Sequence, residues 1–254
     1  MVIRAIYPTG ANLKKIVQSA FAVLDEIPLT FKSETLEAIG LSPDKSTMVI
    51  VRIPSTSFEE YSITEEVELI LEKEDFTKAL KRATKRDRVI MEWSEGYREL
   101  HLVISNVKTG IERMYKVRLR EVAPEKLSEL SLELEVTMQM PSEEFSKIIK
   151  DLRVIGDEVM FSYSSRTGSI IVHSVSENKE YIAELQHFKP LITLQASADA
   201  ASAKYSVDLL KPVAKALDLS DTVTIAFGTA KPMKIYLDLP GGGELIFWIA
   251  PRAA

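Results

Sequence analysis

One pattern typical of an amphipathic helix occurs four times in this chain of 254 residues. In residues 12–24, 74–85, 142–153 and 206–217, apolar residues recur at spacings of three and four, and basic residues recur on the opposite face. The first pair of segments is repeated as the second pair, which favours two similar domains. Pro212 falls inside the fourth pattern, and we expect it to bend or shorten that helix.

Between these segments the pattern changes to period two, which is typical of strands with one buried face. Short glycine-containing turns separate several of these stretches, which favours antiparallel pairing. The expected strands are 47–53, 89–93, 99–105, 115–120, 169–175, 181–185, 223–227, 233–239 and 244–249. The sequence therefore predicts an α+β fold of two similar domains, each an antiparallel sheet with two helices on one face.

The stretch 120–134 interrupts this rhythm because it is acidic and contains Pro124. Such composition between two similar halves is typical of a linker. We therefore expect an N-terminal domain over 1–119, an interdomain connector over 120–134 and a C-terminal domain over 135–254.

Composition excludes several classes of protein. The chain has no cysteine, so neither a disulfide framework nor a zinc-thiolate site can form. Asparagine and glutamine are scarce while 27% of residues are charged, a balance that suggests a thermophilic source. No apolar run approaches the ~20 residues that span a bilayer, and the N-terminus lacks the features of a signal peptide. We expect a cytoplasmic, nucleoid-associated prokaryotic protein without a membrane partner.

Enzymatic readings find little support in the sequence. His101, His173 and His187 have no histidine partner at i, i+4 that would form a metal site. The glycines at 241–243 lack the Lys-Ser/Thr that follows a phosphate-binding loop. A nuclease or nucleotidyl transferase would need clustered carboxylates at metal-ligand spacing, and the sequence offers none. We expect no catalytic residue, no metal and no cofactor.

Three short motifs point to a family. Ile-Ala-Pro-Arg lies at 249–252 near the C-terminus, the second half opens with Met-Pro-Ser-Glu-Glu-Phe at 140–145, and Ser-Pro-Asp at 42–44 precedes a strand. With the repeated halves and the acidic connector, the whole chain resembles PCNA, the sliding clamp of DNA replication in archaea and eukaryotes. The resemblance implies a ring of three chains with pseudo-six-fold symmetry, which tethers enzymes to duplex DNA.

The chain looks closest to the first subunit of crenarchaeal clamps, through its ending and through Arg-Ile-Pro at 52–54 followed by Glu-Tyr-Ser-Ile at 60–63. In that group the ring is often built from different but related subunits. The resemblance leaves open whether identical or paralogous subunits complete the trimer.

The resemblance implies that the helices face a central channel. Twelve helices of ~10 Å diameter make a circumference of ~120 Å, which leaves about 28 Å clear and accommodates a duplex without a tight grip. Lysine suits nonspecific attraction to phosphate, and this acidic chain of net charge -5 concentrates lysine on these faces. For a single helix, a solvated face without function is the more common explanation of such lysines, and only the fourfold repetition favours the functional one. The expected DNA-facing residues are Lys14, Lys15, Lys78, Lys81, Arg82, Lys85, Lys147, Lys150, Arg153, Lys204, Lys211 and Lys215.

The family also has a pocket under the connector for the PIP box, an aromatic-anchored short helix of client proteins. The expected clients are DNA polymerase, flap endonuclease, DNA ligase and the clamp loader. The matching residues, which could otherwise be core, are Leu41, Met48, Leu127, Leu130, Pro232, Trp248, Ala250 and Pro251.

The resemblance places the joint between subunits at two strand edges. Pairing across such edges satisfies backbone groups that otherwise invite aggregation. The expected interface residues are Thr109, Ile111, Arg113, Tyr115 and Val117 on one edge, and Val175, Glu177, Lys179, Tyr181 and Ala183 on the other. The rival reading is a protein-interaction scaffold of the same fold that does not encircle DNA, and such a scaffold has no need of basic helical faces.

Overall fold

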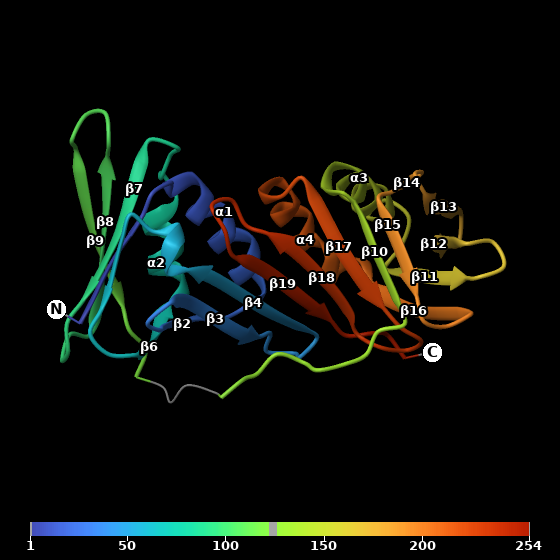
Figure 1. Cartoon of the computed structure of the whole chain (residues 1–254), viewed down its shortest axis with the longest axis horizontal. Helices are drawn as coiled ribbons and strands as arrows, with labels where there is room; N and C mark the ends of the chain where they lie inside the picture. Colours follow the sequence, from blue (N-terminus) through green and yellow to red (C-terminus); the bar gives the residue numbers. More distant parts are fainter. Residues whose placement is uncertain (1, 122–125, 254) are drawn as a thin grey trace. The chain divides into compact units, whose positions relative to one another are not determined.

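The computed structural model describes residues 2–121 and 126–253, so Pro124 of the expected connector lies outside the described residues. The chain divides into two compact units (Figure 1). Unit 1 comprises Met1–Pro43, Val49–Glu129 and Leu239–Leu245, and unit 2 comprises Asp44–Met48, Leu130–Asp238 and Ile246–Ala254. Each unit contains antiparallel strands and two α-helices, so the predicted α+β class is confirmed.

Unit 1 contains one sheet in the order β5-β1-β7-β8-β9 and a second run of strands in the order β4-β3-β2-β6. The first sheet is formed by β1 (Ile3–Tyr7), β5 (Glu60–Ile63), β7 (Asp87–Trp93), β8 (Glu99–Asn106) and β9 (Glu112–Arg118). The second run is formed by β2 (Glu26–Phe31), β3 (Thr35–Leu41), β4 (Thr47–Pro54) and β6 (Val67–Glu72). The helical elements are α1 (Gly10–Ala20), η1 (Phe21–Val23), η2 (Ser55–Ser57) and α2 (Lys73–Leu80).

Unit 2 has a sheet in the order β14-β13-β12-β11-β16 and a run in the order β15-β10-β17-β18-β19. The sheet is formed by β11 (Glu158–Ser164), β12 (Ser169–Ser176), β13 (Lys179–His187), β14 (Pro190–Leu191) and β16 (Ala200–Ser206). The run is formed by β10 (Val136–Pro141), β15 (Thr193–Ala196), β17 (Thr222–Phe227), β18 (Met233–Asp238) and β19 (Glu244–Ile249). The helical elements are α3 (Ser142–Leu152), η3 (Val207–Leu210), α4 (Lys211–Ala216) and η4 (Leu217–Leu219).

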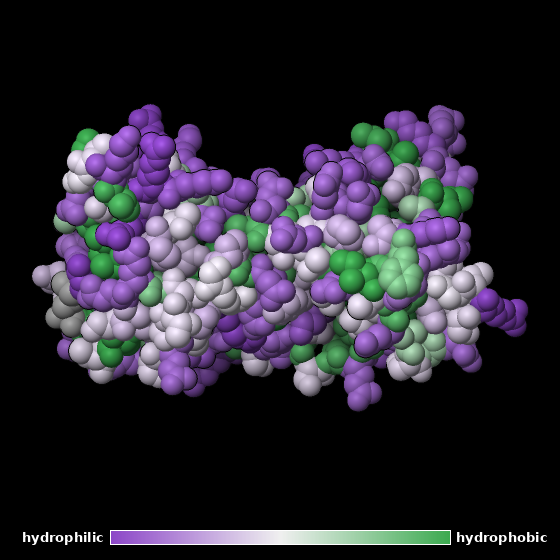
Figure 2. All heavy atoms as spheres, turned by 45° about the horizontal axis from the view of Figure 1, so that its top comes forward, coloured by the Kyte–Doolittle hydropathy of each residue, from purple (hydrophilic) through white to green (hydrophobic). Residues whose placement is uncertain are grey.

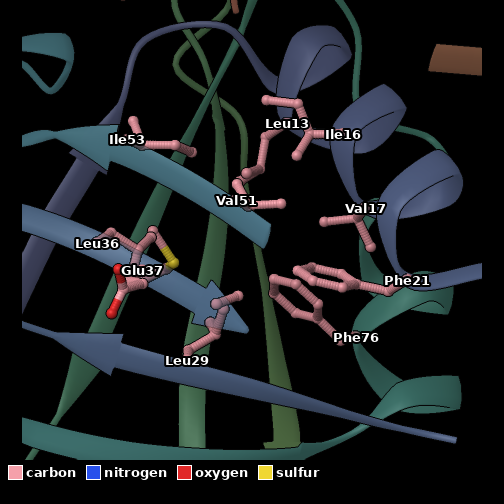
Figure 3. Close-up of a pocket in the computed structure, with 12 residues that line it drawn as sticks. Leu13, Ile16, Val17, Phe21, Leu29, Leu36, Glu37, Val51, Ile53 and Phe76 are labelled. Atoms are coloured by element: carbon pink, nitrogen blue, oxygen red, sulfur yellow. The ribbon is translucent and has the colours of Figure 1, made fainter. Parts of the chain in front are cut away.

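The apolar helical faces form much of each core, as their spacing predicts. Leu13, Ile16 and Val17 of α1 are buried in unit 1, where Figure 3 shows them directed toward Val51 and Phe76. They line a void of about 20 Å³, which is large enough for one or two water molecules at most. Because its lining is almost entirely apolar, this void is a packing defect and does not form a ligand site.

The second helix ends earlier than the sequence predicts. Helix α2 stops at Leu80, so Arg82 and Lys85 lie in the turn that follows and not on the helix. The carboxylate of Asp87 accepts hydrogen bonds from the N–H and the hydroxyl of Thr84, both at 2.8 Å. These bonds stabilise a non-helical turn at Thr84, which is how an aspartate competes with helix continuation.

Pro212 has a clear role in the fourth helical segment. This segment is divided into η3, α4 and η4, and Pro212 lies in the first turn of α4, which is only six residues long. Proline suits the first turn because its missing N–H has no helical acceptor there. The predicted shortening of this helix is therefore confirmed, since the α-helix begins only at Lys211.

Within the described residues, no helix is long and apolar enough to cross a membrane.

Candidate nucleic-acid and partner surfaces

The basic side chains on the helices of unit 1 differ in their exposure and in the contacts that they already make. Lys15 and Lys81 are exposed, whereas Lys14 is half-buried and its Nζ donates to the Ala83 carbonyl at 2.8 Å. Lys78 is exposed and lies 2.9 Å from the Glu74 carboxylate one turn earlier. Such exposed pairs contribute little free energy, so a phosphate can compete with Glu74 for this lysine. Lys14 is the least available of the predicted contacts because a backbone carbonyl already holds it.

Unit 2 repeats this arrangement. Lys147 and Lys150 of α3 are exposed, and Lys147 lies within 3.0 Å of two glutamates from the first turn of its own helix. Arg153 follows the last residue of α3 and is also exposed. Figure 2, in which the helices of each unit come toward the viewer, has hydrophilic side chains over much of this face.

The fourth helical segment carries Lys211 and Lys215, both exposed. Lys211 lies 2.6 Å from Asp208. Lys204 is different, because it lies on strand β16 and its carbonyl accepts a hydrogen bond from the Arg252 N–H at 2.8 Å. The helical basic set of unit 2 therefore does not include Lys204.

The residues predicted for the partner pocket fall into two groups, one in each unit. In unit 1, Leu41 and Leu127 line a hollow of about 350 Å³ together with Ile39 and Ile70. Its lining also contains charged residues, among them Glu26, whose carboxylate lies 3.6 Å from a guanidinium nitrogen of Arg120. The hollow therefore offers apolar and charged side chains together, as peptide-binding grooves commonly do.

In unit 2, the predicted pocket residues differ in exposure. Met48 and Trp248 are buried, with exposed fractions of 7% and 3%. Pro232, Ala250 and Pro251 are half-buried, and Leu130 is exposed. The ammonium group of Lys234 lies 5.3 Å from the centre of the Trp248 ring, a cation–π distance. Leu132, which the sequence reading did not select, is 47% exposed beside Leu130 and adds apolar surface.

Arg52 of β4 lies at the centre of an ion cluster in unit 1. Its Nε donates to Glu37 at 2.8 Å, and its Nη1 contacts Glu244 at 2.5 Å and Glu129 at 3.1 Å. Burial would raise the pKa of the Glu37 carboxyl, but hydrogen bonds from Lys32 and Arg52 hold it below its ordinary value. Burial opposes the charge of Arg52, but the three carboxylates outweigh that effect and raise its pKa. Glu37 and Arg52 are therefore ionised at neutral pH, and the ion pair between Arg52 and Glu129 attaches the connector to β4.

Both strands predicted for the subunit joint lie at sheet edges. Strand β9 is the last strand of its sheet, and β13 is flanked by β12 and only at its end by the two residues of β14. Val117 is buried, and Arg113 and Tyr115 are half-buried, so their side chains face the unit's interior. Thr109 and Ile111 precede β9 and are exposed.

The second predicted edge, at the end of β12 and along β13, is more exposed to solvent than the β9 edge. Val175 at the end of β12, Glu177 in the turn and Lys179 at the start of β13 are exposed. Tyr181 and Ala183 are half-buried. The apolar side chains most exposed to solvent on the two edge strands are Met114 on β9 and Ile182 on β13, at 62% and 61% exposure.

The register between β8 and β9 determines which N–H groups of β9 point toward β8 and which point away from the sheet. Leu119 N–H donates to Arg98 and Asn106 N–H donates to Ile111, which fixes the hydrogen-bonded pairs at each end of the β8–β9 ladder. Because such pairs alternate along an antiparallel ladder, Tyr115 directs its N–H toward β8, and Met114 directs its N–H away from the sheet. The backbone groups open for pairing with another chain belong to Glu112, Met114 and Lys116.

Comparisons with known proteins agree with this architecture. The family model of the proliferating cell nuclear antigen N-terminal domain matches residues 2–127, and that of its C-terminal domain matches residues 130–252. The chain belongs to the PCNA family. The two models together cover nearly all of it, as the resemblance of its motifs predicts.

Individual relatives extend over the full length. DNA polymerase sliding clamp 2 of Sulfurisphaera tokodaii is 31% identical over 252 residues, 99% of this chain and 100% of that protein. DNA polymerase sliding clamp 1 of Saccharolobus solfataricus is 30% identical over 250 residues, 98% of this chain and 99% of that protein. PCNA relatives numbered 1 and 2 thus match this chain at nearly equal identity.

Solved PCNA structures share the fold. PCNA from Thermococcus kodakaraensis superimposes with a TM-score of 0.89 at 19% identity, covering 98% of this chain and all of that one. The PCNA2-PCNA3 complex from Sulfolobus tokodaii gives a TM-score of 0.88 at 27% identity, covering 99% of this chain and all of the matched chain. The predicted clamp fold is therefore confirmed.

PCNA family members are clamps without catalytic activity, and family membership therefore agrees with the non-enzymatic reading of the sequence. The three histidines lie apart from one another in the units: His101 on β8, His173 on β12 beside Glu180 at 3.0 Å, and His187 at the end of β13. Across residues 2–121 and 126–253, no group of three His, Asp or Glu side chains has the arrangement of a metal site.

Proposed function

We propose that this chain is a subunit of a DNA sliding clamp, a trimeric ring that encircles duplex DNA and tethers replication and repair enzymes. The observation that carries the proposal is the repeated basic face on the helices of both units of an acidic chain. Lysines on mobile side chains attract phosphate without fixing a register, which is what sliding requires. The proposed DNA-facing set consists of the exposed helical lysines together with Arg82, Lys85 and Arg153 in the turns that follow the helices.

Client enzymes dock, in this proposal, through PIP-box peptides at the apolar residues along and beneath the connector. The hollow lined by Leu41 and Leu127 and the exposed Leu130 and Leu132 support this assignment. Peptide docking of this type is helix-in-groove recognition, in which a few apolar anchors supply most of the affinity. DNA polymerase, flap endonuclease, DNA ligase and the clamp loader are the expected clients, and the expected location is the nucleoid in the cytoplasm.

Neighbouring subunits, identical or paralogous, join β9 of one chain to β13 of the next. The contact is head-to-tail, so a ring closes only after three compatible joints. The matched Sulfolobus tokodaii structure is a complex of two different subunits, PCNA2 and PCNA3, which supports testing paralogues as well as copies of this chain.

The test is a loading experiment on circular nicked duplex DNA. The assembled ring, with its clamp loader and ATP, should remain on circular DNA through gel filtration at moderate salt and slide off once the DNA is linearised. Retention that does not depend on DNA topology would contradict encirclement. A chain that binds client peptides normally but is never retained on the circle would instead be the scaffold of the rival reading.

A further inference from the structure

The later part of the connector, residues 126–134, makes a side-chain contact to each unit. Glu129 bonds Arg52 of β4 in unit 1 at 3.1 Å. In unit 2, the Nζ of Lys231 donates to the Glu133 carbonyl at 2.8 Å and lies 2.7 Å from the Glu135 carboxylate. Residues 126–134 have no helix or strand of their own, so side-chain bonds such as these decide where this backbone lies.

The residues between the two attachments carry exposed apolar side chains. Leu130 is 39% exposed and Leu132 is 47% exposed. These two exposed leucines form a preordered binding surface only if contacts fix the backbone of the segment. Otherwise a partner must order the segment as it binds, which reduces its affinity.

The contact with Glu129 is separable from the rest of the Arg52 cluster. Without it, Arg52 still bonds Glu37 and Glu244, and Glu37 still bonds Lys32, so no charge in the cluster is left without a partner. Loss of the Glu129 charge therefore removes this attachment of the connector to β4 and leaves the Arg52 ion pairs with Glu37 and Glu244 in place. The contact is also partly shielded from solvent, because the Arg52 and Glu129 side chains are less than one-third exposed.

We propose that Arg52 is a positioning residue for client binding. Through Glu129 it fixes the start of the segment that presents Leu130 and Leu132, so that an apolar peptide meets a preordered surface. This inference rests on the proposed peptide-docking function and adds an electrostatic control to it. Salt that screens the Arg52–Glu129 contact should weaken peptide binding even though the peptide contacts themselves are apolar.

The test compares Glu129→Gln with Glu133→Gln in the full chain. Both variants remove one carboxylate from the same connector, but the backbone carbonyl of Glu133 that accepts from Lys231 is unchanged. The probe is a synthetic PIP-box peptide, and its affinity is measured by calorimetry at low and high salt. Hydrogen exchange of the amides in residues 126–132 reports the order of the connector in the absence of peptide.

Glu129→Gln should weaken peptide binding by about twofold to fivefold at low salt, the usual range for a single ion pair at a partly exposed site. The deficit should disappear at high salt, and exchange in residues 126–132 should be faster at low salt. Glu133→Gln should match the wild-type protein in both measurements. Equal affinity and equal exchange for Glu129→Gln and wild type would overturn the role of Arg52 while leaving peptide docking intact. Failure of the wild-type protein to bind any PIP-box peptide would overturn the docking proposal itself, and this inference with it.

Discussion

Arg113 on the edge strand β9 is paired with the buried carboxylate of Asp87, with 3.3 Å between Nη2 and Oδ2. The Asp87 side chain is only 1% exposed and also accepts hydrogen bonds from Thr84 and from the Asn106 side-chain amide. Burial would raise the pKa of Asp87, but these hydrogen bonds and the Arg113 charge hold it below its ordinary value. Arg113 therefore serves inside unit 1, where one carboxylate connects the turn after α2 to β8 and β9.

Replacing Asp87 by asparagine should destabilise the subunit. Asparagine has the same shape, but its amide group would oppose either the Asn106 amide at the Oδ1 position or the Thr84 and Arg113 donors at the Oδ2 position of this buried site. We expect the free energy of unfolding to fall by about 3 kcal/mol, typical of a broken buried network that involves a charge. Urea denaturation at pH 7 measures this change. Glu95→Gln, in an exposed turn of the same unit, should stay within about 0.5 kcal/mol of wild type, and an equal loss in both variants would contradict the assignment.

The free energy of unfolding should fall at acid pH as Asp87 becomes protonated, and the Asp87→Asn substitution should remove this part of the pH dependence. Folding lowers the pKa of Asp87 below the ~3.9 of an unfolded aspartate, so the carboxylate stabilises the folded state at pH values above about 4. That contribution is lost as the pH falls from about 4 through the folded-state pKa. In unfolding curves between pH 6 and pH 2, the difference in the free energy of unfolding between wild type and Asp87→Asn should therefore narrow as the pH is lowered below about 4. A difference that stays constant over this range would assign the effect to packing instead of ionisation.

The helical lysines should determine the salt dependence of DNA binding. Lys81, Lys150 and Lys215 are exposed on or beside three of the helices, and their joint replacement by alanine should leave folding intact. Each phosphate contact that is lost should reduce the slope of log K against log salt by up to about 0.9. Fluorescence anisotropy of a labelled duplex across a salt series measures the slope for the assembled ring.

A matched triple variant controls for net charge. Lys108, Arg166 and Lys189 are also exposed but lie in loops outside the helical segments. Their replacement by alanine changes the charge of the chain equally and should leave the slope unchanged. If both triple variants alter the slope to the same extent, the helical faces have no special role in DNA binding.

The apolar connector should determine client affinity. Leu130→Ser removes an exposed anchor without disturbing the core, and loss of such a contact typically costs about 2 kcal/mol, or roughly thirtyfold in affinity. Calorimetry with a PIP-box peptide measures it. Val154→Ser, at another exposed apolar site after α3, should bind the peptide as wild type does. Full-strength binding by Leu130→Ser would place the pocket elsewhere.

Sequence periodicity predicted the helices and nine of the strands because each of those segments repeats one physical rule along its length. Strands such as β2 and β3 were missed, since Pro28 and Gly40 interrupt their runs with residues that strands usually avoid. The end of α2 was also misplaced. The apolar spacing continues to Ala83, but the Thr84–Asp87 bonds that end the helix depend on three-dimensional placement.

The candidate site was harder to predict for the same reason. Arg52 appears in the sequence as one arginine in an apolar strand, and its three carboxylate partners come from β3, β19 and the connector. No periodic rule links residues so far apart in the chain. Met114 did leave a local signal, because it is apolar on the polar side of an alternating strand, between Glu112 and Lys116.

The joint between subunits can be tested with two neighbouring proline substitutions. Met114 directs its N–H away from the sheet, so Met114→Pro removes a donor that only another chain could use. Proline is tolerated at such an edge position, and the isolated subunit should keep its stability. Assembly, measured by light scattering after gel filtration with copies of this chain or with paralogues, should be abolished.

Tyr115→Pro provides the contrast one residue further along the strand. The N–H of Tyr115 points to Leu102 on β8, so its loss breaks a ladder bond inside unit 1 and should lower the melting temperature of the subunit itself. The pair separates an interface effect from a folding effect, since the N–H and the side chain of Tyr115 both serve unit 1, whereas the N–H of Met114 points away from the sheet and its side chain is exposed. A Met114→Pro protein that still forms trimers would place the joint on another surface of the chain. A Met114→Pro protein as unstable as Tyr115→Pro would instead show that both donors serve the fold.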